Sequence, residues 1–130
     1  MLNAVKKIQT DYILFFFEDF IIKNKIKHED LNEIFNYTKK NKIDFFKLNC
    51  SKRKIHNKLN LHNGIIIGDI PLNDPYPLPL QVAFWNKNFL EESLQFDLNQ
   101  WQFEHNIKNY LNLKKYKRVT IVNNPPIIYY

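Results

Sequence analysis

An uninterrupted apolar run near the start of the chain, DYILFFF (11–17), limits the folds that this sequence can adopt. The run holds residues that favour strands and is too short for a buried helix, so it predicts a strand that is buried on both faces. Such a strand belongs near the centre of a sheet that helices cover on both sides.

The next two segments predict a helix and a second strand. KHEDLNEIFNYTKKN (27–41) carries its acids early and its lysines late, which is the charge order that the helix dipole favours. IDFFKLN (43–49) reads as a strand. A strand, a helix and a strand in succession predict a right-handed parallel crossover. We therefore expect an α/β fold with a mostly parallel central sheet flanked by helices, in a single domain over residues 1–130.

The remaining segments alternate between short helical and short β-rich patterns. Asn99 is a candidate N-cap for the last helix. A stretch with four of the six prolines, IPLNDPYPLPL (70–80), predicts stiff, irregular backbone. The further helices are expected at 2–9, 87–95 and 98–113, and the further strands at 65–69, 80–86, 118–122 and 127–130.

The composition excludes several classes of site. Only two glycines are present, and neither a G-x-G-x-x-G nor a G-x-x-x-x-G-K-[ST] motif occurs, which disfavours a glycine-rich nucleotide loop. The single cysteine, Cys50, excludes an internal disulfide and a cysteine-based metal cluster. No stretch approaches the roughly 20 apolar residues that a membrane-spanning helix needs.

The formal net charge of +6 favours anionic partners, namely nucleic acid, acidic lipid or a phosphorylated small molecule. Two basic runs, SKRK (51–54) and KKYKR (114–118), are candidates for contact with phosphates or lipid head groups, or are simply solvated. Nucleic acid is the least favoured partner, because no known binding motif occurs and the basic residues are spread along the chain.

Two adjacent acids, Glu18 and Asp19, follow the apolar run directly. One interpretation is that the strand leaves the core through a polar turn. The other is that both carboxylates converge at the carboxyl end of the strand, where open α/β sheets bind ligands. Carboxylate oxygens suit Mg²⁺ or Mn²⁺, either of which neutralises a diphosphate.

A second acid stands beside a tryptophan in NQWQFEHN (99–106). On a helix, Trp101 and Glu104 are three residues apart and share a face. A carboxylate beside an indole can act as a general base for a hydroxyl. The alternative is a helix with Trp101 in the core and Glu104 solvated. His105 is a candidate for phosphate contact.

Gln81 interrupts the otherwise apolar segment PLPLQVAFWN (77–86). If the amide is buried, it needs hydrogen-bond partners, which either a sugar hydroxyl or the backbone would supply.

The order of these features resembles the later half of a family of bacterial GT-A type glycosyltransferases from capsule and lipopolysaccharide gene clusters. The resemblance is carried by an apolar strand that ends in FFFEDF (15–20), by YPLPLQVAFWNKNFLEESL (76–94) and by NQWQFE (99–104). In that family, the acidic strand end is the counterpart of the metal-binding DxD element.

The resemblance implies transfer of a sugar from a nucleotide-sugar donor to a polysaccharide or lipid-linked acceptor. Glu104 would be the catalytic base. Glu18 and Asp19 would face the donor diphosphate, with Asp19 holding a divalent cation, Mg²⁺ or Mn²⁺. Four further side chains would shape the acceptor or sugar pocket: Gln81, Trp85, Trp101 and His105.

The resemblance also implies that the chain is a partial GT-A domain. Family members begin with a strand and a helix that bind the nucleotide base, and they continue beyond IIYY (127–130). We therefore expect a truncated domain in the cytoplasm, with peripheral contact at the inner face of the cell membrane.

A rival hypothesis is a non-catalytic remnant or split subunit. A sheet without its first strands exposes a strand edge, and a partner chain would complete it. A third hypothesis, a small basic nucleic-acid-binding module, predicts binding that weakens steeply with salt.

Overall fold

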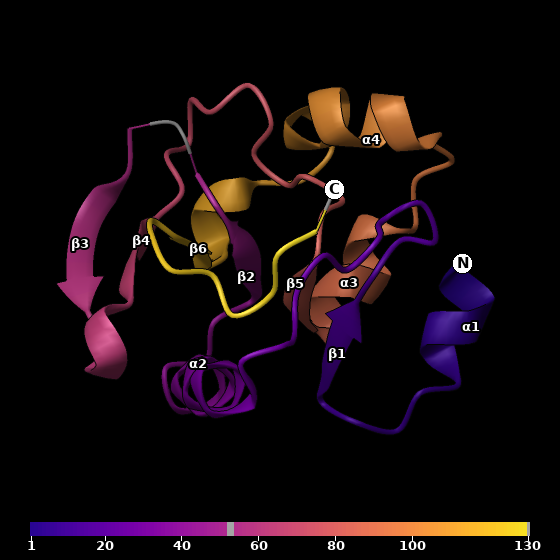
Figure 1. Ribbon diagram of the computed structural model, residues 1–130. Coiled ribbons are helices and arrows are strands. Elements are labelled where there is room, and N and C mark those ends of the chain that lie inside the picture. The colour runs from indigo at the N-terminus through magenta and orange to yellow at the C-terminus, as the bar shows by residue number, and fades with distance from the viewer. Residues whose placement is uncertain (52–53, 130) are drawn as a thin grey trace.

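A six-stranded mixed sheet forms the centre of the computed structural model, which describes residues 1–51 and 54–129 (Figure 1). The strand order across the sheet is β1-β5-β2-β6-β4-β3. The strands are β1 (Tyr12–Phe15), β2 (Phe45–Cys50), β3 (His56–Asn60), β4 (Ile66–Asp69), β5 (Ala83–Asn86) and β6 (Arg118–Ile121).

The expectation of a mostly parallel α/β sheet is wrong. Among the strands of residues 1–51 and 54–129, only β2 and β6 pair in parallel, and the other four strand pairs are antiparallel, so the fold is α+β. The helix between β1 and β2 does return the chain in the same direction. However, β5 lies between these two strands and pairs antiparallel with both, so the crossover does not produce a parallel pair.

The apolar run 11–17 is not a central strand. Its strand part, β1, lies at the edge of the sheet and is only partly buried, and Leu14 is 44% exposed. The run continues beyond β1 into an aromatic cluster, in which the ring of Phe16 packs edge-on against that of Phe20 and both lie beside the ring of Tyr129.

Four helices cover the two faces of the sheet (Figure 1). They are α1 (Leu2–Lys6), α2 (His28–Lys40), α3 (Lys87–Ser93) and α4 (Gln100–Asn106). Buried side chains of α2 belong to one core, and those of α1, α3 and α4 belong to the other. Alternation along the strands separates the cores: Phe46 and Phe84 face α2, whereas Phe45 and Trp85 face the other helices.

The chain after α4 is less helical than expected. The predicted helix 98–113 ends at Asn106 and gives way to two 3₁₀ turns, Ile107–Asn109 and Leu113–Lys115. Each turn buries its first residue in the core. A continuous helix would have to place both side chains on one face, and their spacing of six residues does not allow this.

The end of the chain does not add a strand. In the predicted strand 127–130, one isolated bridge joins Tyr129 to Ile22, and Tyr130 lies outside the described residues. Within the described part of the chain, no helix combines the length and the apolar character needed to cross a bilayer.

Candidate functional site

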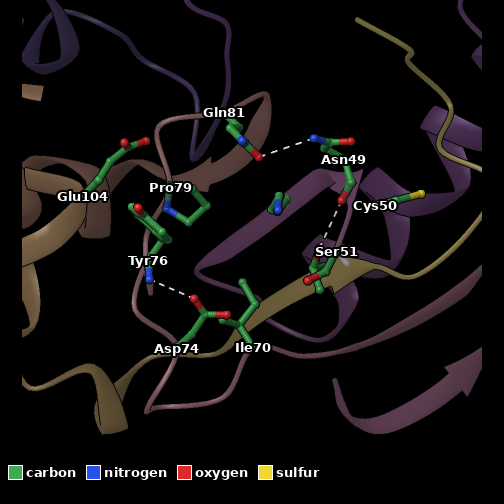
Figure 2. Close-up of a pocket in the computed structure, with 11 residues that line it drawn as sticks. Asn49, Cys50, Ser51, Ile70, Asp74, Tyr76, Pro79, Gln81 and Glu104 are labelled. Carbon is green, nitrogen blue, oxygen red and sulfur yellow. Dashed lines mark hydrogen bonds between the residues drawn. The ribbon is translucent and has the colours of Figure 1, made fainter. Parts of the chain in front are cut away.

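A polar pocket of about 380 Å³ opens at one end of the sheet, beside α4 (Figure 2). Four parts of the chain form it: the carboxyl end of β2, the proline-rich segment that leads to β5, α4, and Thr120 of β6. The lining residues are Lys47, Asn49, Cys50, Ser51, Ile70, Asp74, Tyr76, Pro79, Gln81, Glu104 and Thr120.

The pairing of β2 with β5 brings two amides together on one side of the pocket. Because the strands are antiparallel, the carboxyl end of β2 lies beside the amino end of β5, where the Leu48 N–H donates to the Val82 carbonyl at 2.9 Å. Just beyond, the Asn49 amide donates to Gln81 Oε1 at 3.5 Å. Gln81 therefore precedes β5 instead of lying within a strand, and its amide contacts a side chain at the pocket wall (Figure 2).

Arg118 fixes the shape of the proline-rich wall. Its guanidinium, on β6, is buried and donates to the carbonyl of Pro77 at 2.8 Å and to that of Ile70 at 3.3 Å. Burial lowers the pKa of Arg118, while the charges of Asp74 and Asp69 act in the opposite direction. The prolines leave this segment few backbone donors, so a side chain supplies the bonds that a regular element would make.

Asp74 shapes the tip of the same segment. One of its carboxylate oxygens accepts a hydrogen bond from the Tyr76 N–H at 2.8 Å, which is a local turn of the kind that aspartate favours. The turn places both side chains at the lower rim of the pocket in the view of Figure 2.

Glu104 closes the pocket from the α4 side and contacts the wall directly. Its Oε1 accepts a hydrogen bond from the Leu80 N–H at 2.6 Å. A capping box positions the helix: Asn99 accepts from the Gln102 N–H, and the Gln102 side chain accepts from the Asn99 N–H. Asn99 is thus confirmed as the N-cap, and Glu104, which is half-buried, has a structural role through its bond to Leu80.

Trp101 and His105 lie beside the pocket and do not line it. Trp101 is 67% exposed, so it does not belong to the core, and its ring lies 4.4 Å from the His105 ring, centroid to centroid. The His105 ring is 4.6 Å from that of Tyr76, which does line the pocket.

Trp85 is placed elsewhere. It is fully buried on β5, with its ring 4.6 Å from Phe45 and 5.6 Å from Phe89, and it is not among the lining residues. Alternation along the strand turns Trp85 into the core of α1, α3 and α4. A direct contact between Trp85 and a sugar is not consistent with this placement.

Glu18 and Asp19 form an exposed turn two residues after β1. Since β1 and β2 run in the same direction, this turn lies at the same end of the sheet as the pocket, although neither acid lines it. Among the described residues, no group of three His, Cys, Asp or Glu side chains is suitably placed to hold a metal ion.

Several polar lining residues carry no signal in the sequence. Lys47, Cys50 and Thr120 come from β2 and β6, which are distant in sequence from the proline-rich segment. Burial raises the pKa of the Cys50 thiol, an effect that Lys47 opposes. Pairing of the strands alone brings them together, so no local motif predicts them.

The described residues of the two basic runs differ in burial. In KKYKR (114–118), Arg118 is buried, while the three lysines are exposed. In SKRK (51–54), Ser51 lines the pocket, and Lys52 and Arg53 lie outside the described residues.

Comparison with known proteins gives no relative: no family model, no curated protein and no solved structure matches this chain.

Proposed function

We propose that this chain is a glycosyltransferase, or part of one, that moves a sugar from a nucleotide-sugar donor to a polysaccharide or lipid-linked acceptor. One observation carries the proposal. Gln81 and Glu104, from two of the three segments that carry the resemblance, lie on the wall of a single polar pocket. Its volume of about 380 Å³ is in the usual range for small-molecule sites.

The lining suits a sugar. A sugar hydroxyl both donates and accepts hydrogen bonds, and the pocket offers amides, hydroxyls, carboxylates and one ammonium group. Such a mixture fixes the orientation of a polyhydroxylated ring better than an apolar lining would.

Glu104 is the proposed base. Its carboxylate takes the proton of an acceptor hydroxyl while that oxygen forms a bond to the anomeric carbon of the donor sugar. The bond from the anomeric carbon to the diphosphate oxygen breaks, and its electron pair leaves with the nucleoside diphosphate. One Glu104 oxygen accepts from Leu80, which holds the carboxylate in place for this step.

Glu18 and Asp19 are the proposed contacts for the donor diphosphate and a divalent cation, Mg²⁺ or Mn²⁺. Two adjacent carboxylates on an exposed turn fit such an ion, because Mg²⁺ typically takes one or two carboxylates together with substrate phosphates and water. When bound, the cation would neutralise charge on the leaving diphosphate. The proposed acceptors are assembled at the inner face of the cell membrane, so we place the chain there, on the cytoplasmic side.

The substitution Glu104→Gln tests the base. Gln retains an oxygen that accepts from the Leu80 N–H, so the pocket wall is expected to keep its shape while the proton acceptor is lost. We expect transfer of labelled sugar from a panel of nucleotide-sugars to fall by at least about a hundredfold, as typical for loss of a general base. Donor binding is expected to change little.

The matched control is Glu91→Gln, which removes an acid that pairs with Lys87 at 3.6 Å outside the pocket. It is expected to leave transfer unchanged. Equal loss of donor binding and transfer in Glu104→Gln would contradict the base role.

A binding test needs no turnover. Cys50, the only cysteine of the chain, is not a suitable probe, because its thiol points away from the pocket in Figure 2 and packs with the core under α2. Equilibrium dialysis with labelled nucleotide-sugars should instead detect binding to the wild type, and Gln81→Leu, which removes an amide from the pocket wall, should weaken it. Equal binding by the wild type and Gln81→Leu would argue against binding there.

The second candidate function is a subunit that binds a partner chain through the edge of the sheet. One contrast favours it. β3, at one edge, is polar, fully exposed and irregular in register, all of which discourage strand addition. β1, at the other edge, is apolar and regular in register.

Leu14 and Leu59 provide a matched test of this candidate. They are 44% and 47% exposed and lie on the two opposite edge strands. If β1 recruits a strand, Leu14→Lys should abolish association in size-exclusion chromatography with light scattering, and Leu59→Lys should not. A stable monomer at all concentrations, with no chain captured from the producing cell, would argue against this candidate.

A further inference from the structure

Three aromatic rings, those of Tyr76, His105 and Trp101, form a continuous strip that leads from the pocket to solvent. Tyr76 lines the pocket, its ring contacts that of His105, and His105 contacts Trp101 one helical turn earlier on α4. Successive centroids are 4.6 and 4.4 Å apart. We call these three residues the aromatic strip.

Packing of the fold does not account for the strip. Trp101 leaves 67% of its surface in water, whereas Trp85 is fully buried. The side of α4 that packs inward is occupied by Phe103. The indole of Trp101 thus presents an exposed aromatic face beside a polar pocket, where a ligand can stack on it.

The tilt of the rings favours a chain of sugars over a nucleobase. The planes of Trp101 and His105 meet at 44°, and those of His105 and Tyr76 at 59°. A nucleobase is one flat ring system that stacks on a single aromatic face, so it would use only one ring of the strip. Sugar units rotate relative to one another along a glycan, so successive units can stack on faces of different tilt.

We infer that the acceptor is an oligosaccharide that lies along the aromatic strip, with its terminal sugar in the pocket and the next unit stacked on Trp101 and His105. The inference depends on the proposed function, which gives the pocket a sugar. It adds that recognition extends beyond one sugar unit and that the acceptor approaches over α4.

The two tryptophans make the inference measurable in the whole chain. Trp101 should account for the emission that iodide quenches, and the buried Trp85 for the rest. The probes are trisaccharides of several linkages, their constituent monosaccharides, glycans released from the surface of the producing cell, and uridine and adenosine monophosphates.

At least one trisaccharide or released glycan is expected to protect Trp101 from iodide, whereas its monosaccharide is not. Trp101→Ala should weaken binding of that glycan about three- to tenfold and leave monosaccharide binding unchanged, as expected for the loss of one stacking contact. The matched control is Tyr110→Ala, which removes another exposed aromatic side chain, one that contacts Phe96 outside the strip.

The other outcomes overturn the inference. Protection of Trp101 by nucleoside monophosphates alone would make the strip a nucleobase platform, and no protection by any glycan would exclude an acceptor subsite. Equilibrium dialysis with labelled nucleotide-sugars distinguishes this failure from failure of the proposed function. If a nucleotide-sugar binds, and Gln81→Leu weakens that binding, while no glycan shields Trp101, the pocket proposal stands and the strip inference falls. If a glycan shields Trp101 while no nucleotide-sugar binds, the pocket proposal falls.

Discussion

The side chain of Arg118 determines the form of a pocket that it does not line. The guanidinium is buried beneath the proline-rich wall and bonds the carbonyls of Ile70 and Pro77. In the sequence, Arg118 belongs to the basic run KKYKR (114–118), which predicts an exposed side chain. The sequence has no means of showing that β6 is a central strand whose first residue points inward.

Replacement of Arg118 by Met should loosen the wall. Met fills much of the same volume but cannot donate a hydrogen bond, so the carbonyls of Pro77 and Ile70 lose their partner. We expect a loss of about 2 kcal/mol in the free energy of unfolding, the cost of leaving buried polar groups without hydrogen bonds. Urea denaturation measures it.

Lys114→Met is the control for Arg118→Met, because it removes a neighbouring positive charge from an exposed position. Equal stability of the two variants would show that Arg118 does not hold the wall.

Glu104, Gln81 and Trp85 show how far residue motifs can be trusted. Glu104 and Gln81 line one pocket, and their roles there stay a prediction. Trp85 does not, because its position in β5 turns it away from the pocket and into the core. The strand pattern of QVAFWN (81–86) is apolar on both faces, so it contains no information about which residues face a pocket.

At the scale of elements, α4 positions Trp101, Glu104 and His105 together. The helix has only seven residues, which is too short to be stable by intrinsic propensity. Its capping box and the burial of Phe103 therefore decide whether it forms. Asn99 at its start is the feature that was visible in the sequence, whereas the early end at Asn106 was not.

Asn99→Ala should lower the stability of α4 as a whole, because it removes the side chain that caps the helix. The lost cap is expected to destabilise the protein by about 1 kcal/mol. Because α4 carries Trp101, Glu104 and His105, iodide quenching of Trp101 should differ from that of the wild type. The proposed transfer activity should fall as the folded fraction of the helix falls.

Asn99→Asp is the matched control, because it keeps a side-chain oxygen that accepts from the Gln102 N–H. An Ala variant with the stability and quenching of the wild type would show that the capping box is dispensable.

β3 is the element that the sequence did not reveal at all. HNKLN (56–60) is exposed throughout and shows no apolar alternation. Its partner β4 accommodates it through Gly68, where a Cβ atom would stand 2.2 Å from Ile55 Cγ2 and 2.7 Å from the His56 carbonyl oxygen. The pairing therefore needs a glycine that admits the Ile55 side chain and the His56 backbone, whereas β3 itself buries no residue. Sequence patterns report burial, so they do not reveal this strand.

At the scale of the whole molecule, the segments were largely predictable and their pairing was not. Helix 27–41 corresponds to α2 (His28–Lys40), and strand 43–49 to β2 (Phe45–Cys50). The direction of the sheet depends on β5, which arrives late in the chain and inserts between β1 and β2. A pairing over this separation depends on tertiary packing, so local patterns cannot predict it.

The molecule as a whole should lose stability in strong alkali. A hydrogen bond to Glu92 raises the pKa of Tyr116 to about 12, and burial raises that of Tyr129 to about 12. Both values exceed the ordinary tyrosine pKa near 10, so folding favours the protonated phenols. Their contribution is complete below about pH 10 and is lost as the pH rises towards 12.

Urea midpoints measured from pH 8 to 12 provide the check, with tyrosinate absorbance as the titration signal. The double variant Tyr116→Phe, Tyr129→Phe keeps both rings and removes both phenols, so its midpoint should fall less between pH 10 and 12. An identical decline in the double variant and the wild type would assign alkaline sensitivity to other groups.

The bond from Glu104 to the Leu80 N–H bears on how such a chain would change over generations. A hydrogen-bond acceptor at position 104 holds the pocket wall whether or not any sugar is transferred, so selection for folding alone would retain one. Gln meets that need as well as Glu does, and only the proposed transfer chemistry requires the acid. Replacement of Glu by Gln among descendants would therefore indicate a protein that still folds but has lost the proposed transfer activity. Strict retention of Glu would indicate that the proposed activity is kept.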